Sequence, residues 1–220
     1  MGGDGIAGRG DGNTARGDGN AARDGGTPGF RLVSERRQFD GHVFSVGTVT
    51  VADPDGCEFD RDVVHHPGAV SIVAVHEDRT VTLVRQFRAA VGEALLELPA
   101  GTRDVDGEAP EATARRELAE EAGLAAGQLR RLASVANAPG SSDQRTILFL
   151  ATAMVPCATA PVGVEERWMT VERVPLDDVE RLVAEGRLVD ATTIIGLLLA
   201  RSALGGGAGG GGAGGPAHGT

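Results

Sequence analysis

One stretch of the chain, Pro110–Ala122, constrains the fold more than any other, because its residues predict a helix with an acidic face and an apolar face. Successive residues of an α-helix are about 100° apart, which places Glu117, Glu120 and Glu121 within an arc of about 100°. Gly123 follows at a position where helices commonly end. The neighbouring arc carries small and apolar side chains, namely Ala114, Leu118 and Ala122.

The acidic face gives the helix no stability of its own. Glutamates three and four residues apart repel each other by roughly a few tenths of a kcal/mol per pair. A divalent cation reverses this effect, because Mg²⁺ prefers carboxylate oxygens and is commonly shared with the phosphates of a substrate. A loose acidic cluster is more simply explained as a solvated surface, so the wider pattern around the helix has to decide between the two interpretations.

Short apolar segments surround this helix and predict β-strands. We expect strands within Phe30–Ala52 and at Val63-Val64, Ala69–Val75, Thr80–Phe87, Leu129–Ala138 and Arg145–Ala153. Two further segments predict helices, at Leu176–Glu185 and Ala191–Ala203. Strands interspersed with a few helices indicate a mixed α/β fold built in layers.

Glycine marks the two ends of the chain. Of 34 glycines, 11 lie in residues 1–29 and 10 in residues 202–220. These stretches cannot bury enough apolar area to offset the entropy of ordering them, so residues 1–29 and 205–220 are expected to be disordered tails. The remainder divides into a small N-terminal β extension, residues 30–64, and a main domain, residues 65–204.

Charge and composition exclude several classes of protein. The formal net charge of −10 argues against a nucleic-acid-binding surface. Apolar runs stay below the roughly 18 residues of a membrane-spanning helix, and no secretory signal follows Met1. Cys57 and Cys157 lack metal-binding or disulfide spacing. We therefore expect a cytoplasmic protein that binds neither nucleic acid nor membrane, although a small phosphorylated ligand needs only local positive groups or a metal.

The stretch from Gly101 to Leu124 resembles the Nudix box, Gly-x5-Glu-x7-Arg-Glu-U-x-Glu-Glu-x-Gly-U, in which U is apolar. Every position from Glu108 onward matches, through Arg116 and the three glutamates of the helix. Gly101 departs from the pattern, because six residues instead of five separate it from Glu108. At average residue frequencies, a chance match in a chain this long is on the order of one in a million or less.

The flanks narrow the resemblance to ADP-ribose pyrophosphatases. Arg85-Gln86-Phe87-Arg88 and Leu96-Glu97-Leu98-Pro99-Ala100-Gly101 are similar to segments of that subgroup. The resemblance implies a Nudix-type α/β/α sandwich with a mixed β-sheet and Mg²⁺-dependent hydrolysis of ADP-ribose to AMP and ribose 5-phosphate, with Mn²⁺ as a possible substitute. It also implies a homodimer that exchanges an N-terminal strand region, which residues 30–64 would supply.

The resemblance assigns roles to individual residues. It implies a metal site formed by Glu117, Glu120, Glu121 and the carbonyl of Ala100. Arg116, included among the catalytic residues, would orient the carboxylates through an ion pair with Glu108. Substrate binding would fall to Arg85, Arg88 and Glu97.

The general base is expected outside the box, in the loop of residues 162–166. We favour Glu166 and keep Glu165 as the alternative. Gln144 stands where relatives tend to carry Glu, and an amide cannot replace a carboxylate as a base. Two other functions remain open: hydrolysis of another nucleoside diphosphate sugar or dinucleotide, and non-catalytic nucleotide sensing.

Overall fold

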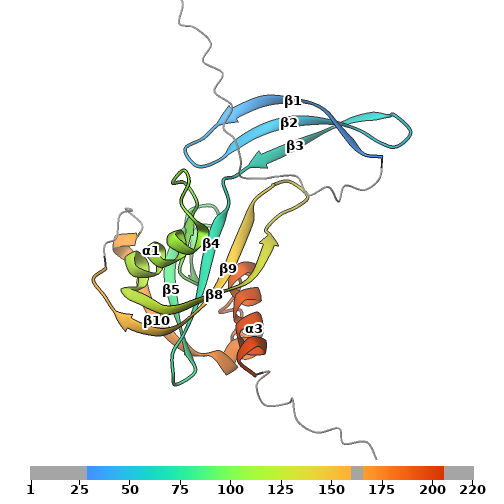
Figure 1. The fold of residues 1–220 in the computed structure, drawn as a ribbon. Helices are drawn as coiled ribbons and strands as arrows, with labels where there is room; N and C mark the ends of the chain where they lie inside the picture. The colour runs from blue at the N-terminus through green and yellow to red at the C-terminus, as the bar shows by residue number, and fades with distance from the viewer. Residues whose placement is uncertain (1–28, 160–165, 206–220) are drawn as a thin grey trace, which may run out of the picture.

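The computed structural model describes residues 29–159 and 166–205 as two β-sheets with helices packed on the larger one (Figure 1). The N-terminal and central elements are β1 (Arg31–Asp40), β2 (Ser45–Ala52), β3 (Glu58–His65), β4 (Ala69–Val75), β5 (Thr80–Arg88), β6 (Glu93–Glu97), β7 (Ala100–Thr102) and α1 (Pro110–Ala122). They are followed by β8 (Leu124–Ala136), β9 (Arg145–Pro156), the 3-10 turn η1 (Glu166–Trp168), β10 (Thr170–Pro175), the 3-10 turn η2 (Leu176–Asp178), α2 (Val179–Ala184) and α3 (Ala191–Gly205).

The larger sheet is mixed and splits between two of its strands. Its order is β10-β5-β4-β9-β8, and β4 runs parallel to β9, whereas its other strand pairs are antiparallel. β4 and β5 pair only beside their shared turn, at Ala74 with Thr82 and at Val75 with Val81. Farther along, β6 pairs with β5 and β7 pairs with β4. The split therefore places β7, which leads toward α1, inside the sheet.

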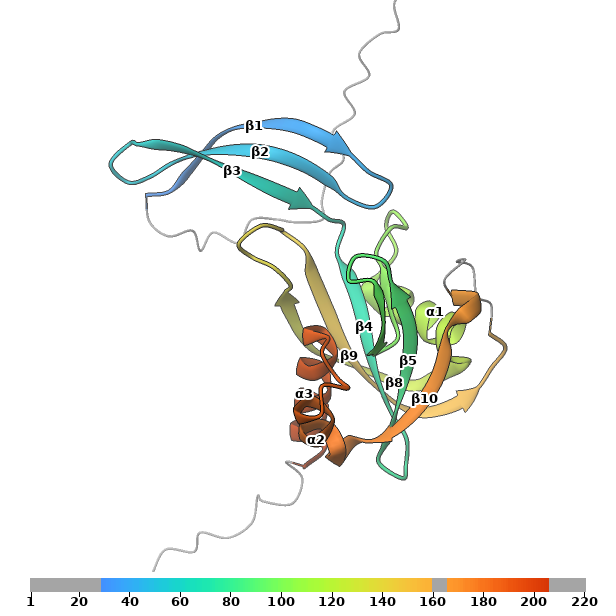
Figure 2. The ribbon, with the colours of Figure 1, turned by 180° about the vertical axis from the view of Figure 1, so that it is seen from behind.

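Two apolar cores lie on opposite faces of this sheet. Successive side chains of a strand point to opposite faces, and β4 shows this alternation: Val70 and Ile72 pack with α1, whereas Val73 packs with α2 and α3. Figures 1 and 2 show α1 on one face and α2 with α3 on the other. The predicted α/β/α sandwich with a mixed sheet is thus confirmed.

Helix α1 has the bounds that the sequence predicts. Pro110 occupies its first turn, and Gly123 ends it with a left-handed φ of 64°, its N–H directed at the carbonyls of Leu118 and Ala119. Leu118 is fully buried, as the apolar arc requires. Pro110 and Gly123 therefore fix where the helix begins and ends, and the buried Leu118 fixes its rotation about its own axis. As a result, its glutamates face a defined direction.

Helix α3 supports the segment that enters β7. The backbone N–H of Leu98 donates to Oγ1 of Thr193, 3.0 Å away, in a buried hydrogen bond. Gly196 allows close contact here, because a Cβ at that position would lie 2.7 Å from Cδ1 of Leu98. The helix on one face of the sheet thus holds the chain that reaches the site on the other.

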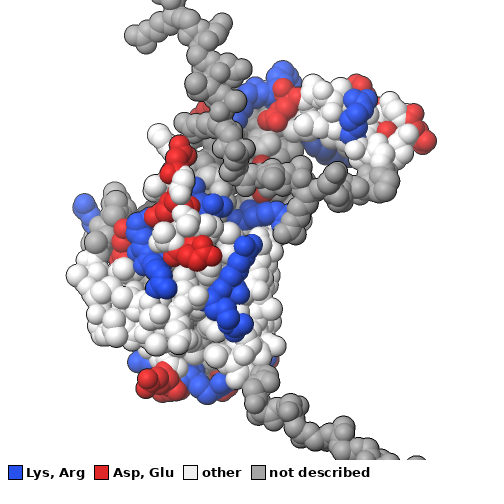
Figure 3. All heavy atoms as spheres, viewed as in Figure 1, with Lys and Arg blue, Asp and Glu red and all other residues white. Residues whose placement is uncertain are grey.

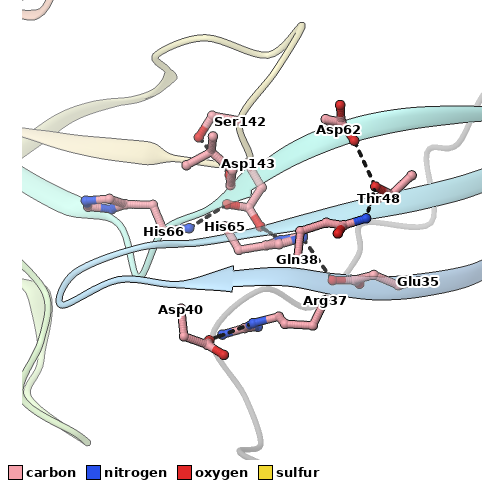
Figure 4. A network of polar contacts seen from close by, with 11 residues as sticks. Glu35, Arg37, Gln38, Asp40, Thr48, Asp62, His65, His66, Ser142 and Asp143 are labelled. Atoms are coloured by element: carbon pink, nitrogen blue, oxygen red, sulfur yellow. Dashed lines mark hydrogen bonds and ion pairs between the residues drawn. The ribbon is translucent and has the colours of Figure 1, made fainter.

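The N-terminal residues form a separate antiparallel sheet of order β1-β2-β3, as the predicted β extension requires. His65, at the end of β3, links this sheet to the main domain (Figure 4). Its Nδ1 lies 2.8 Å from Oδ2 of Asp143, and its Nε2 lies 3.0 Å from Oε1 of Glu35. Asp143 also accepts a hydrogen bond from the backbone N–H of His66, at 2.9 Å. A carboxylate from each part therefore contacts one imidazole.

Several boundaries differ from those predicted. Strands β6, β7 and β10 were not predicted, because they are short and carry polar residues among the apolar ones. The segment predicted as one helix, Leu176–Glu185, begins as η2 and continues as the six-residue α2. Gly205, assigned to the C-terminal tail, ends α3. The rest of the two predicted tails, residues 1–28 and 206–220, lies outside the described residues. None of the described helices is long and apolar enough to cross a membrane.

Candidate active site

Two glutamates of α1 contact β7 directly. Oε2 of Glu121 accepts a hydrogen bond from the backbone N–H of Ala100, at 2.9 Å. Glu117 lies against the next residue, because a Cβ placed on Gly101 would be only 2.0 Å from Cδ of Glu117. Glu121 is 9% exposed, so its carboxylate is largely removed from water. Glycine at position 101 thus makes the space that Glu117 occupies.

Arg116 lies among the carboxylates. Its Nη1 is 2.7 Å from Oε1 of Glu117 and 3.1 Å from Oε2 of Glu120, and its Nη2 is 3.4 Å from Oε2 of Glu108. Burial disfavours the charge on Arg116, but the hydrogen bonds to Glu108 and the attraction of the glutamates raise its pKa well above the ordinary value. The guanidinium therefore stays charged and holds three carboxylates in place.

Glu108 is fixed from two sides before the helix begins. The hydrogen bond from Arg116 lowers its pKa, and Oγ1 of Thr113, which donates to Oε2 of Glu108 at 2.9 Å, lowers it further. Thr113 is buried and lies one turn into α1. Thr113 was not predicted as a site residue, because its contact with Glu108 depends on the path of the loop and not on a fixed spacing.

The donor set suits a hard divalent cation. Glu117, Glu120 and Glu121 supply carboxylate oxygens, and Ala100 is tied to Glu121, so its carbonyl belongs to the same small region. Within the described residues, no three His, Cys, Asp or Glu side chains surround a common point as metal ligands would. Two of the glutamates instead turn toward Arg116, which offsets their mutual repulsion. The residues therefore fit Mg²⁺ by chemistry and location, and the assignment stays a prediction.

The three residues predicted to bind substrate divide between two faces of the sheet. Arg88 pairs with Glu97, with Nη2 2.5 Å from Oε2. Burial disfavours the charge on Arg88, but Glu97 and the nearby charge of Glu121 raise its pKa above the ordinary value. Arg85 is three residues away on the same strand, so it points to the opposite face, and its Nε lies 2.6 Å from Oε1 of Glu172. Of the three, Arg88 is influenced by the charge of Glu121 in α1, and Glu97 is paired with Arg88, whereas Arg85 points to the other face.

The predicted general base is not tested by these contacts. Glu166 begins η1, but its side chain is not among those described, and Glu165 lies outside the described residues. Both assignments stay predictions.

Acidic and basic side chains are interleaved over α1 and the loop before it (Figure 3). Much of the surface beside them is neither acidic nor basic. A site that balances both charges in this way can bind a cation and an anion next to each other, as a metal-assisted reaction on a phosphate requires.

The chain is similar to a protein family, to two proteins of known name and to a solved structure. The family model described as NUDIX domain matches residues 65–188. The ADP-ribose pyrophosphatase of Mycobacterium tuberculosis is 37% identical over 169 residues, which cover 77% of this chain and 82% of that protein. The ADP-ribose pyrophosphatase of Bacillus subtilis is 32% identical over 163 residues, covering 74% and 88%. A solved structure described as an ADP compounds hydrolase shares the fold, with a TM-score of 0.71 at 22% identity over 81% of this chain and 96% of that one.

The contact between Gly101 and Glu117 yields a test by substitution. Gly101→Ala should displace the Glu117 carboxylate, because no room exists for a methyl group, and should weaken Mn²⁺ or Mg²⁺ binding about tenfold or more. Isothermal titration calorimetry of the folded variant with Mn²⁺ measures this affinity. Gly140→Ala is the matched control, since nothing lies within 4 Å of its Cβ position. Equal metal affinity in Gly101→Ala and wild type would show that Glu117 does not bind metal from this position.

Proposed function

The chain belongs to the Nudix family of pyrophosphohydrolases, and from this premise we propose that it hydrolyses ADP-ribose to AMP and ribose 5-phosphate with Mg²⁺ as its cofactor. The observation that carries the proposal is the contact of Glu117 and Glu121 with the two adjacent residues of β7. The names of the two curated relatives support ADP-ribose as the substrate. We further propose that the protein acts in the cytoplasm.

We propose a role for each of these site residues, and the contacts described above support it. We propose that Glu117, Glu120, Glu121 and the Ala100 carbonyl hold Mg²⁺, which when bound neutralises charge on the diphosphate oxygens. The ion pairs of Arg116 within the described residues are with the carboxylates of Glu108, Glu117 and Glu120, so we assign it to positioning them. Glu108 and Thr113 in turn fix the guanidinium, which keeps the metal ligands from separating.

The chemical step needs a water molecule and a base. We propose that Glu166 removes a proton from water as its oxygen forms a bond to phosphorus and the bridging P–O bond of the diphosphate breaks. A base is most efficient when it is held within hydrogen-bonding distance of the water that it activates. Residues 162–166 resemble the segment that carries the general base in similar enzymes, which supports this assignment. Glu165 is the alternative in the same segment.

The metal assignment is tested by Glu121→Gln. The amide keeps the size of the side chain but loses its charge, so Mg²⁺-dependent kcat/KM for ADP-ribose should fall by about 10²-fold or more. Glu111→Gln is the matched control, because Glu111 is an exposed glutamate in the first turn of the same helix. Release of AMP, measured by chromatography, gives the rates.

The same assay separates the alternatives. Turnover of GDP-mannose or NADH at least as fast as that of ADP-ribose would replace the proposed substrate with another dinucleotide or nucleotide sugar. Nucleotide binding without any turnover by the wild-type protein would indicate a sensor. Full activity of Glu121→Gln in an active protein would show that the metal assignment is wrong.

The base assignment predicts a different pattern. Glu166→Gln should lower kcat by a factor of about 10²–10⁴ while Mn²⁺ affinity stays unchanged, because the side chain acts on water and not on the metal. Single-turnover rates with Mg²⁺ and ADP-ribose measure the chemical step. If Glu165→Gln shows this loss and Glu166→Gln does not, Glu165 is the base.

We propose that residues 30–64 mediate a homodimer. Every residue of β1 is exposed, and its apolar side chains include Leu32 at 61% and Phe39 at 54% exposure. Apolar groups on an outer strand favour association with another chain. We propose that a second copy of the chain covers these apolar side chains.

The dimer is tested by placing a charge on β1. Leu32→Asp and Phe39→Asp should each shift the protein toward monomer in light scattering after size exclusion, because an aspartate cannot be buried without a partner. Val155→Asp serves as the control, since Val155 is 59% exposed but lies at the end of β9. A wild-type protein that is monomeric at micromolar concentration would contradict the proposal.

A further inference from the structure

We propose that Arg103 binds a phosphate oxygen of the diphosphate substrate, beside the carboxylates of α1. This inference rests on the proposed function and extends it to a residue outside the Nudix box motif. Arg103 lies in the loop between β7 and α1, where the chain has one residue more than the Nudix pattern.

The register of β7 places Arg103 on the face that α1 covers. Gly101 pairs with Val70, and Val70 belongs to the core under α1. Two residues farther along, the N–H of Arg103 donates to the carbonyl of Gly68, at 3.1 Å, so the pairing continues past the end of the strand. Because side chains two residues apart point to the same face, Arg103 shares the face against which Glu117 lies.

Arg103 differs from the other arginines of similar burial. The described residues include five half-buried arginines, and four of them pair with a carboxylate: Arg85, Arg88, Arg116 and Arg201. No hydrogen bond or ion pair joins the Arg103 side chain to any described residue, although Asp104 and Asp106 are close in sequence. Its Nε is buried and lacks a hydrogen-bond partner within the described part of the chain.

The buried, unpaired Nε of Arg103 is costly unless it donates to an anion. A buried polar group without a partner loses its hydration, and the loss is larger for a charged one. The planar fork of arginine matches a phosphate, which can accept two of its N–H groups. The guanidinium lies beside Gly68, since a Cβ at that position would be 4.0 Å from Nη1 of Arg103. The guanidiniums of Arg88 and Arg116 are already engaged by glutamates, whereas Arg103 has donors left for a ligand.

The experiment compares Arg103→Met and Arg103→Lys with wild type, using ADP with Mg²⁺ as the binding probe and adenosine as the probe without phosphate. Arg103→Met should weaken ADP binding and lower kcat/KM for ADP-ribose by roughly 10- to 100-fold. Arg103→Lys should recover part of both losses, because it restores the charge without the fork. Adenosine affinity and Mn²⁺ affinity should not change, and the Tm should not fall. Arg130→Met, at an exposed arginine of β8, is the matched control.

Three outcomes would overturn the inference. Unchanged ADP affinity in Arg103→Met shows that no phosphate contacts this residue. Equal losses of ADP and adenosine affinity, with a lower Tm in both variants, show that Arg103 only supports the fold. A wild-type protein that binds no ADP overturns this inference together with the proposed function. A wild-type protein that binds ADP through Arg103 but does not hydrolyse ADP-ribose contradicts the proposed function alone and supports the phosphate contact.

Discussion

Three glutamates share one guanidinium, and the organisation of the site depends on this arrangement. Without Arg116, Glu108, Glu117 and Glu120 would repel one another beside the nearly buried Glu121. The attraction between Arg116 and these carboxylates is strong because the cluster is partly removed from water, and charges that are partly buried are screened less than charges in water. Arg116 therefore sets the spacing of the acidic groups, so the cluster proposed to bind a divalent cation is already assembled and partly neutralised.

The split in the larger sheet is what brings these side chains to backbone atoms. If β4 and β5 paired along their full lengths, no room would exist for β7, and Ala100 could not donate its N–H to Glu121. The divergence costs the direct pairing of two strands, which β6 and β7 replace with their own ladders. The gap between β4 and β5 is thus the place where the backbone of β7 contacts the glutamates of α1.

The bounds of α1 were predictable because they follow from local patterns: an apolar arc, a proline near the start and a glycine at the end. The mixed α/β class follows from strands interspersed with helices, and the α/β/α sandwich was implied by the resemblance to the Nudix family. The sequence did not predict β6 or β7, since these short strands are defined by their partners more than by their own residues. The contact of Thr113 with Glu108 and the position of Arg103 beside Gly68 were missed for a related reason. Each depends on the path of the loop between β7 and α1, and no residue spacing encodes that path.

The hydrogen bond between Leu98 and Thr193 also sets an order of events during biosynthesis. Translation proceeds from the N-terminus, so α1 and its glutamates leave the ribosome well before Thr193 is made. At roughly 5–20 residues per second, the ribosome takes about 5–20 s to advance the 95 positions from Leu98 to Thr193. A nascent chain that already contains the whole acidic helix therefore still lacks the support that holds the segment before β7.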